Sequence, residues 1–246
     1  LVFGKDAKPW VPKKPPTFGQ VGARLGLGLY SGNMELASGA LNSKSSMYPS
    51  IFLNGEVWVT PEYSIHADIR QAIIPVSNPR SGGSPKELNQ SLSSYSLLFG
   101  YNWRLGANIW GPKVEALVGY STYRLYVDNS TPRGLTTLEY GGLKLGVDGS
   151  FPVTGDGLWS AGARVFLFLK SSLNESPSSS GGNPKNSITQ FALYGFYKFR
   201  ENMKLTGVLD VEMYSSTFSG KGDSNDRATS VSQKHTTLSG GIEYMF

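Results

Sequence analysis

Ten runs of alternating apolar and polar residues follow one another along this chain, and the repeat limits what the chain can fold into. In the first run, Val21 and Leu25 share one face while Gly22 and Arg24 share the other, because side chains alternate with a period of two along a strand. This periodicity predicts β-strands. The ten runs are Phe18–Tyr30, Ile51–Val59, Tyr63–Ile74, Ser93–Trp103, Val114–Arg124, Leu143–Asp148, Trp159–Lys170, Gln190–Arg200, Leu205–Met213 and Thr237–Phe246.

The connections between these runs alternate between short turns and long polar stretches. Pro61 and Glu62 form one short turn, and Glu201 and Asn202 form another. Consecutive runs joined in this way form hairpins, with all the long connections at one end of the sheet. The expected long loops are residues 31–50, 75–90, 128–136, 171–187 and 219–234.

The polar faces of the runs separate a soluble barrel from a membrane barrel. In a soluble barrel these faces meet water and are rich in Lys, Glu, Thr and Gln, whereas here they carry many of the 30 glycines and single charges of both signs. Such faces suit a crowded interior. Runs of about ten residues also match a tilted strand that crosses a bilayer. We therefore predict that residues 18–246 form an all-β fold, a transmembrane antiparallel up-and-down β-barrel of about ten strands.

Aromatic residues gather near the ends of the runs, as they do at the two interfaces of membrane barrels. We expect one aromatic girdle near the short turns, formed by Trp58, Tyr63, Trp103, Trp110, Trp159, Tyr197, Phe199, Tyr244 and Phe246. We expect the opposite girdle to be formed by Tyr30, Tyr48, Tyr126, Tyr140 and Tyr214.

Composition excludes several other classes of protein. No stretch of 18 apolar residues exists, which excludes a helical membrane protein. The absence of cysteine and the presence of only two histidines, His66 and His235, argue against a metal site, and no cofactor is expected. The net charge of +5 comes from scattered basic residues, so nucleic acid is not an expected partner.

The last residues, GGIEYMF, resemble the terminal-strand signal of bacterial outer-membrane β-barrels. The resemblance implies a chain in the outer membrane of a Gram-negative bacterium, in contact with its lipids and recognised by the barrel-assembly machinery. It also implies that both chain ends and the short turns face the periplasm. The residues that carry the signal are Leu238, Gly240, Ile242, Tyr244 and Phe246.

Residues 1–17 are rich in proline and lysine and contain a lone Trp10. This composition predicts a periplasmic tether and not a strand. Two interpretations stay open. The tether either connects the barrel to a periplasmic or envelope-complex partner, or it is a disordered N-terminus.

A ten-stranded barrel has a backbone radius of only about 10 Å, so inward side chains meet near its axis. We expect the first strand to pair with the last, which would bring Arg24 near Glu243. We also expect opposite charges in this lumen to pair, with Asp148 as the partner of Arg164. The predicted ion-pair network contains Arg24, Glu56, His66, Asp68, Arg70, Glu115, Lys144, Asp148, Arg164, Lys198, Asp210, Glu212 and Glu243.

A filled lumen indicates a structural anchor or scaffold subunit, and a narrow pore for ions or small solutes is the alternative. An outer-membrane protease of the omptin type is a third interpretation, because a histidine and carboxylates occur as His66 with Asp68 and as Asp210 with Glu212. Their spacing places both pairs within strands and not at the rim. We therefore expect no catalytic residues and no enzymatic activity.

Overall fold

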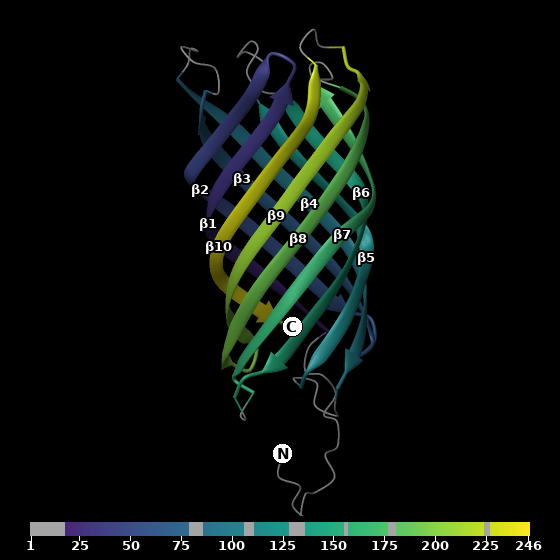
Figure 1. Ribbon diagram of the computed structural model, residues 1–246. Coiled ribbons are helices and arrows are strands. Elements are labelled where there is room, and N and C mark those ends of the chain that lie inside the picture. Colours follow the sequence, from purple (N-terminus) through teal and green to yellow (C-terminus); the bar gives the residue numbers. More distant parts are fainter. Residues whose placement is uncertain are drawn as a thin grey trace, which may run out of the picture.

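The computed structural model describes residues 18–78, 86–105, 111–127, 136–154, 157–176, 181–223 and 227–246, and these residues form one closed antiparallel barrel (Figure 1). The proposed tether, residues 1–17, and Trp110 lie outside the described residues. The ten strands are β1 (Gly19–Leu36), β2 (Gly39–Trp58), β3 (Tyr63–Ser77), β4 (Glu87–Arg104), β5 (Lys113–Val127), β6 (Thr137–Pro152), β7 (Trp159–Ser176), β8 (Gly181–Arg200), β9 (Met203–Lys221) and β10 (Ala228–Met245).

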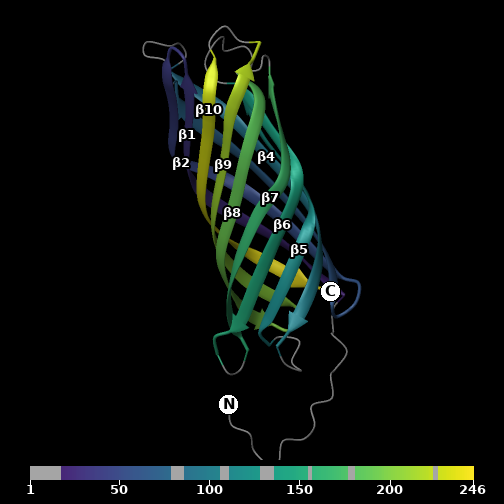
Figure 2. The same ribbon diagram turned by 45° about the vertical axis from the view of Figure 1, so that its right-hand side comes forward.

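Each strand pairs with its neighbours in sequence, and β1 pairs with β10 to close the barrel. The register places Leu27 opposite Leu238, and the amide of Phe246 donates to the carbonyl of Gly19 at 3.1 Å. Strands tilt in the same sense around the whole wall (Figure 2). The predicted fold class and the closure by the first and last strands are therefore confirmed. Among the described residues, no helix is long and apolar enough to cross a membrane.

The strands extend beyond the runs that the alternation predicted, into most of the expected long loops. Residues 31–50 belong almost entirely to β1 and β2, which are joined by a turn at Ala37 and Ser38. Strands also enter the expected loops at 75–90, 171–187 and 219–234. Those loop predictions are wrong because the pattern that marked the strands, apolar residues facing outward, stops partway along each strand.

The pattern stops because the barrel reverses its polarity along its axis. Toward the end that carries the short turns and Phe246, here called the terminus end, Leu25 and Leu29 of β1 face outward and are 70% and 55% exposed. Toward the opposite loop end, Tyr30 and Met34 of the same strand face inward and are buried. The outward face there carries polar residues such as Ser31. One half resembles a membrane barrel and the other a soluble barrel.

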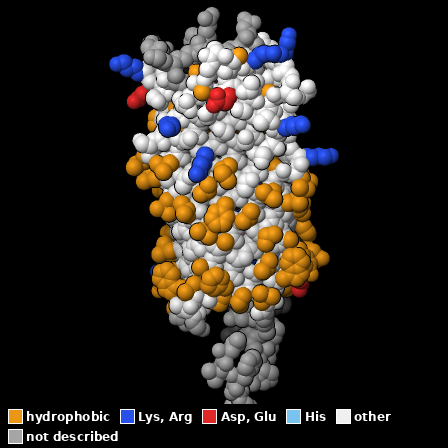
Figure 3. Space-filling model, viewed as in Figure 1, with side chains coloured by type: hydrophobic (Ala, Val, Ile, Leu, Met, Phe, Trp, Pro, Cys, Tyr) orange, Lys and Arg blue, Asp and Glu red, His pale blue; other side chains and the backbone are white. Residues whose placement is uncertain are grey.

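The outer surface shows this division directly. Hydrophobic side chains cover the lower half of the molecule, and Lys and Arg lie above them (Figure 3). A band of outward-facing apolar side chains next to the chain ends is the surface that a membrane barrel presents to lipid.

The expected girdle at the terminus end forms in large part. The rings of Tyr63 and Phe99 stack with centroids 5.6 Å apart, and those of Trp159 and Tyr197 stack at 4.6 Å. Trp58 departs from the prediction, because it shares the inward face of Glu56 and its indole N–H donates to Glu56 Oε1 at 2.5 Å.

The girdle predicted at the loop end is wrong for four of its five members. Tyr126 faces outward and is 39% exposed, but the other four tyrosines are buried inside the barrel. The error has a physical cause, because tyrosine suits a lipid interface and a hydrogen-bonded core equally well. The buried members are Tyr30, Tyr48, Tyr140 and Tyr214.

Glycine on the inward face makes room for these rings. A Cβ atom at Gly28 would meet the ring of Tyr48, which crosses from the adjacent strand. The glycine-rich inner faces noted in the sequence therefore reflect a crowded lumen.

Candidate functional site: the barrel lumen

The loop-side half of the lumen is filled by a group of aromatic residues, here called the tyrosine plug: Tyr48, Tyr123, Tyr140, Tyr214 and His235. None of the five is more than 1% exposed. The rings of Tyr123 and Tyr214 stack with centroids 3.9 Å apart. Apolar side chains from the surrounding strands, including Ile74 and Leu92, pack against the plug.

Polar atoms within the plug are paired. Tyr48 Oη lies 3.0 Å from His235 Nδ1, and Tyr123 Oη lies 2.7 Å from His235 Nε2. Arg70 Nη2 donates to Tyr48 Oη at 2.7 Å, and Arg70 Nη1 pairs with Glu212. Arg70 therefore joins the plug to the charged part of the lumen. Because buried polar groups are costly when unpaired, this network favours one fixed arrangement of the rings.

The rest of the lumen is charged and contains open space. A terminus-side cavity of about 140 Å³ extends from Trp58 and Lys113, at the strand ends, to Arg164 and Asp210. A central cavity of about 70 Å³ lies next to it and shares Arg24, Asp68, Arg164 and Asp210 as lining residues. Both cavities are large enough for water.

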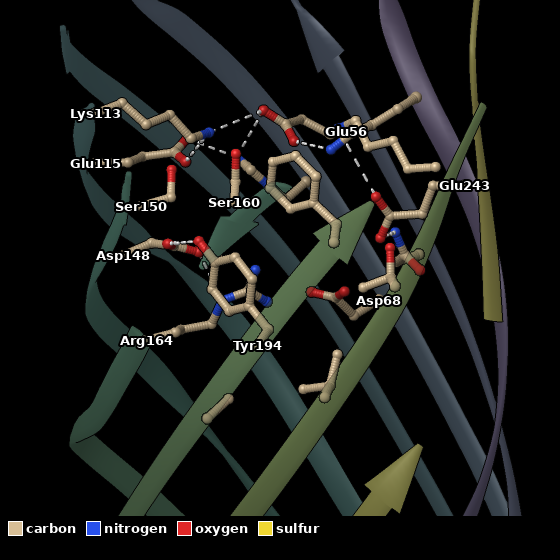
Figure 4. Close-up of a pocket in the computed structure, with 18 of the residues that line it drawn as sticks. Glu56, Asp68, Lys113, Glu115, Asp148, Ser150, Ser160, Arg164, Tyr194 and Glu243 are labelled. Carbon is tan, nitrogen blue, oxygen red and sulfur yellow. Dashed lines mark hydrogen bonds and ion pairs between the residues drawn. The ribbon is translucent and has the colours of Figure 1, made fainter. Parts of the chain in front are cut away.

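Four ion pairs cross the wall or the interior of these cavities. Arg164 Nε lies 2.8 Å from Asp148 Oδ2, which agrees with the expected pair, and Tyr194 Oη also donates to Asp148 (Figure 4). The remaining pairs are Arg24 with Asp210 at 4.0 Å, Lys204 with Glu243 at 3.9 Å, and Arg70 with Glu212.

The expected contact between Arg24 and Glu243 is therefore replaced by two other pairs. Both side chains face inward on neighbouring strands, but the register puts Gly22 and not Arg24 opposite Glu243. The partners that they take, Asp210 and Lys204, both come from β9.

The densest cluster lies at the terminus end, where Glu56, His66 and Glu115 meet Lys113. His66 Nε2 lies 2.7 Å from Glu115 Oε1 and 4.0 Å from Glu56 Oε1. Lys113 Nζ lies 3.4 Å from Glu115 Oε2 and 3.9 Å from Glu56 Oε1 (Figure 4). The side chains of Glu56 and Glu115 are 8% and 1% exposed, so two buried carboxylates share this site with two basic groups, His66 and Lys113, that are partly open to the cavity.

The structure thus collects the sequence-predicted residues on the inward face but changes several partners. His66 contacts Glu56 and Glu115, whereas Asp68 lines both cavities. Lys144 has its ammonium 4.1 Å from the centre of the Phe166 ring. Lys198 shares the inward alternation of β8 with Tyr194.

Sequence reasoning missed four residues that complete the terminus-side site. Gln20, Lys113 and Lys204 lie at strand ends, where alternation is hardest to follow, and Trp58 was assigned to the lipid interface. Gln20 Nε2 donates to Glu56 Oε2 at 2.6 Å, and Lys204 Nζ donates to Gln20 Oε1 at 2.7 Å. Trp58 is two residues from Glu56 on the same strand, and residues two apart share a face. This spacing is the sequence signal that would have predicted an inward-facing Trp58.

Comparison with solved structures found similar outer-membrane proteins, of which the first supports the fold. The outer membrane protease OmpT from Escherichia coli is similar, with 13% identity, a TM-score of 0.59, and coverage of 97% of this chain and 99% of that chain. The translocator domain of autotransporter NalP from Neisseria meningitidis has 12% identity, covers 92% of this chain and 88% of that chain, and has a TM-score of 0.40. No protein-family model and no curated protein sequence matches the chain.

The chain therefore has the fold of bacterial outer-membrane β-barrels. The apolar band next to its terminus end is the surface that this fold presents to the outer membrane.

Proposed function

We propose that this barrel is a non-conducting membrane anchor that holds a partner bound through residues 1–17 at the outer membrane. The observation that carries the proposal is the tyrosine plug. Tyr123 and Tyr214 belong to strands on opposite sides of the barrel, and their stacked rings cross the lumen. Buried apolar residues surround them, so the described residues leave ions no continuous hydrated path through this half of the lumen.

The surroundings of His66 and His235 do not favour the protease interpretation. Both ring nitrogens of His235 contact tyrosine hydroxyls in the plug, so in the part of the chain that the structure describes neither nitrogen is paired with a carboxylate. His66 lies at the terminus end, where its Nε2 contacts both Ser64 and Glu115. The protease interpretation needs a histidine paired with carboxylates at the rim of the loop end, whereas His66 pairs with Glu115 at the terminus end. We therefore propose a barrel without enzymatic activity.

A narrow pore is the second candidate, and the two water-sized cavities favour it. They are lined by charges of both signs and together reach from the strand ends to the region of Arg70. Among the described residues, the tyrosine plug and the buried apolar side chains around it separate these cavities from the loop end.

Conductance in a planar bilayer distinguishes the two functions. We expect the unmodified barrel to pass no steady current and a Tyr123→Ala/Tyr214→Ala double variant to conduct, because it removes both stacked rings. Tyr126→Ala is the matched control, since this tyrosine lies on β5 but faces outward, and it should leave the barrel closed. Steady, ion-selective channels in the unmodified protein would replace the anchor with the pore.

A further inference from the structure

We propose that the terminus-side cavity holds a binding site for a first-row divalent metal ion such as Zn²⁺, with Glu56, His66 and Glu115 as ligands. This inference is independent of whether the barrel is an anchor or a pore. One nitrogen and two carboxylate oxygens from three different strands converge there, and all three donor atoms lie within 4.8 Å of one another.

The distances between the donor atoms suit a small ion. Zinc binds nitrogen and oxygen at about 2.0 to 2.2 Å, so two ligands of a tetrahedral ion lie roughly 3.4 Å apart. His66 Nε2 is 2.7 Å from Glu115 Oε1 and 4.0 Å from Glu56 Oε1. Bringing these two distances, and a separation of at most 4.8 Å between the two carboxylate oxygens, to about 3.4 Å needs changes of no more than about 1.4 Å.

A second observation is an unpaired polar atom beside the cluster. Asn102 is only 4% exposed, and its Oδ1 atom is buried without a hydrogen-bond partner among the described residues. Asn102 pairs with Glu115 across β4 and β5, and its Nδ2 atom donates to Ser64 Oγ at 3.4 Å. Ser64 Oγ in turn contacts both His66 Nε2 and Glu115 Oε1. A water bound to the metal would supply the donor that Asn102 Oδ1 lacks.

The neighbours of the three ligands are arranged to hold them. Glu56 accepts from Gln20 and Trp58, and Ser64 donates to Glu115, so both carboxylates are oriented by other side chains. A Cβ atom at Gly100 would meet Glu115 and Ser64, so glycine at this position leaves the space that these groups occupy. Such support is what metal ligands generally need.

The positive charge of Lys113 weakens the attraction of the site for a cation. Its ammonium lies 3.4 Å from Glu115 and 3.9 Å from Glu56, so it neutralises part of the charge that would attract a cation. When His66 is neutral, the net charge of the site is −1, because two glutamates carry one negative charge each and Lys113 carries one positive charge. Removing Lys113 would raise the attraction for a divalent ion.

Calorimetric titration of the untagged, detergent-solubilised full chain with ZnCl₂ tests the proposal, and the absorption spectrum of bound Co²⁺ reports the ligand geometry. We expect one ion per barrel. Glu115→Gln and His66→Gln should abolish binding or weaken it beyond about 100-fold, and Asn102→Ala should weaken it about 10- to 100-fold, as loss of an outer partner does. Glu139→Gln, which changes an exposed carboxylate on the outer surface, should leave the affinity unchanged.

Lys113→Met should bind Zn²⁺ more tightly than the unmodified protein. Misfolding cannot produce such a gain, so this variant distinguishes loss of a ligand from failure to fold. The unmodified protein binding no Zn²⁺ would overturn the proposal. Binding that survives both Glu115→Gln and His66→Gln in folded protein would overturn it, as would an affinity that Lys113→Met does not raise.

Discussion

The ring of Tyr123 in β5 stacks on the ring of Tyr214 in β9, with centroids 3.9 Å apart. In the closed order of strands, three strands separate β5 from β9 on one side and five on the other, so this contact spans the barrel. It links opposite walls at the level where the polarity of the interior changes. The contact makes the loop-side half a packed core and leaves the terminus-side half as a charged, partly open chamber.

Replacing Arg164 by Ala should lower the free energy of unfolding by about 3 kcal/mol, the low end of the range for breaking a buried pair. The low end applies because the Arg164 side chain is 33% exposed to the cavity, while the Asp148 side chain left behind is 5% exposed. Urea unfolding in lipid vesicles, followed by tryptophan fluorescence, measures the change.

Arg124→Ala is the control for that prediction. Arg124 and Glu139 are also an ion pair, at 4.0 Å, but their side chains are 50% and 48% exposed on the outer surface. This substitution should change the unfolding free energy by only about 0 to 1 kcal/mol. Equal effects of the two arginine substitutions would show that charges in the terminus-side cavity are screened as well as charges on the outer surface.

Gly28→Ala should destabilise the barrel by about 1 to 3 kcal/mol, because the added methyl group would meet the Tyr48 ring and overpack the lumen. Gly207→Ala provides the comparison, since nothing lies within 4 Å of a Cβ atom there. It should be nearly neutral in the same unfolding experiment. If Gly28→Ala did not change the free energy of unfolding either, the lumen beside Tyr48 would have room for a methyl group and the overpacking argument would be wrong.

Leu209→Arg should cost about 2 to 4 kcal/mol in a lipid bilayer, because Leu209 is at the centre of the outward-facing apolar run of β9. Ser219→Arg lies on the same outward face of β9, ten residues nearer the loop end, and should cost close to nothing. Unfolding in vesicles of both variants tests where the apolar band ends. Similar costs at the two positions would contradict the reversal of polarity along the barrel.

Deleting Phe246 should impair insertion into the outer membrane of cells much more than folding of the purified chain in detergent. Its ring is 46% exposed and its burial contributes at most about 1.5 to 3 kcal/mol, whereas recognition of a terminal strand signal is all or none. Phe246→Tyr keeps an aromatic end and should insert normally. Normal insertion of the deletion variant would argue against an assembly role for this residue.

The alternation of residues was sufficient to predict the barrel. Strand pairing needs only a period of two and a consistent outward face, and runs such as Leu205–Met213 show both in the sequence. The same logic predicted closure through β10 and the pairing of Arg164 with Asp148, since inward residues on neighbouring hairpin strands lie opposite each other.

The tertiary structure decided what the sequence left ambiguous. A buried tyrosine and an interfacial tyrosine look alike in sequence, and only closure of the barrel shows that Tyr48 and Tyr214 point into a core. Closure also brings together Glu56, His66 and Glu115 from three strands, at distances that depend on stagger and curvature. Local periodicity reports which face a side chain takes, whereas its partners across the lumen depend on the register of all ten strands.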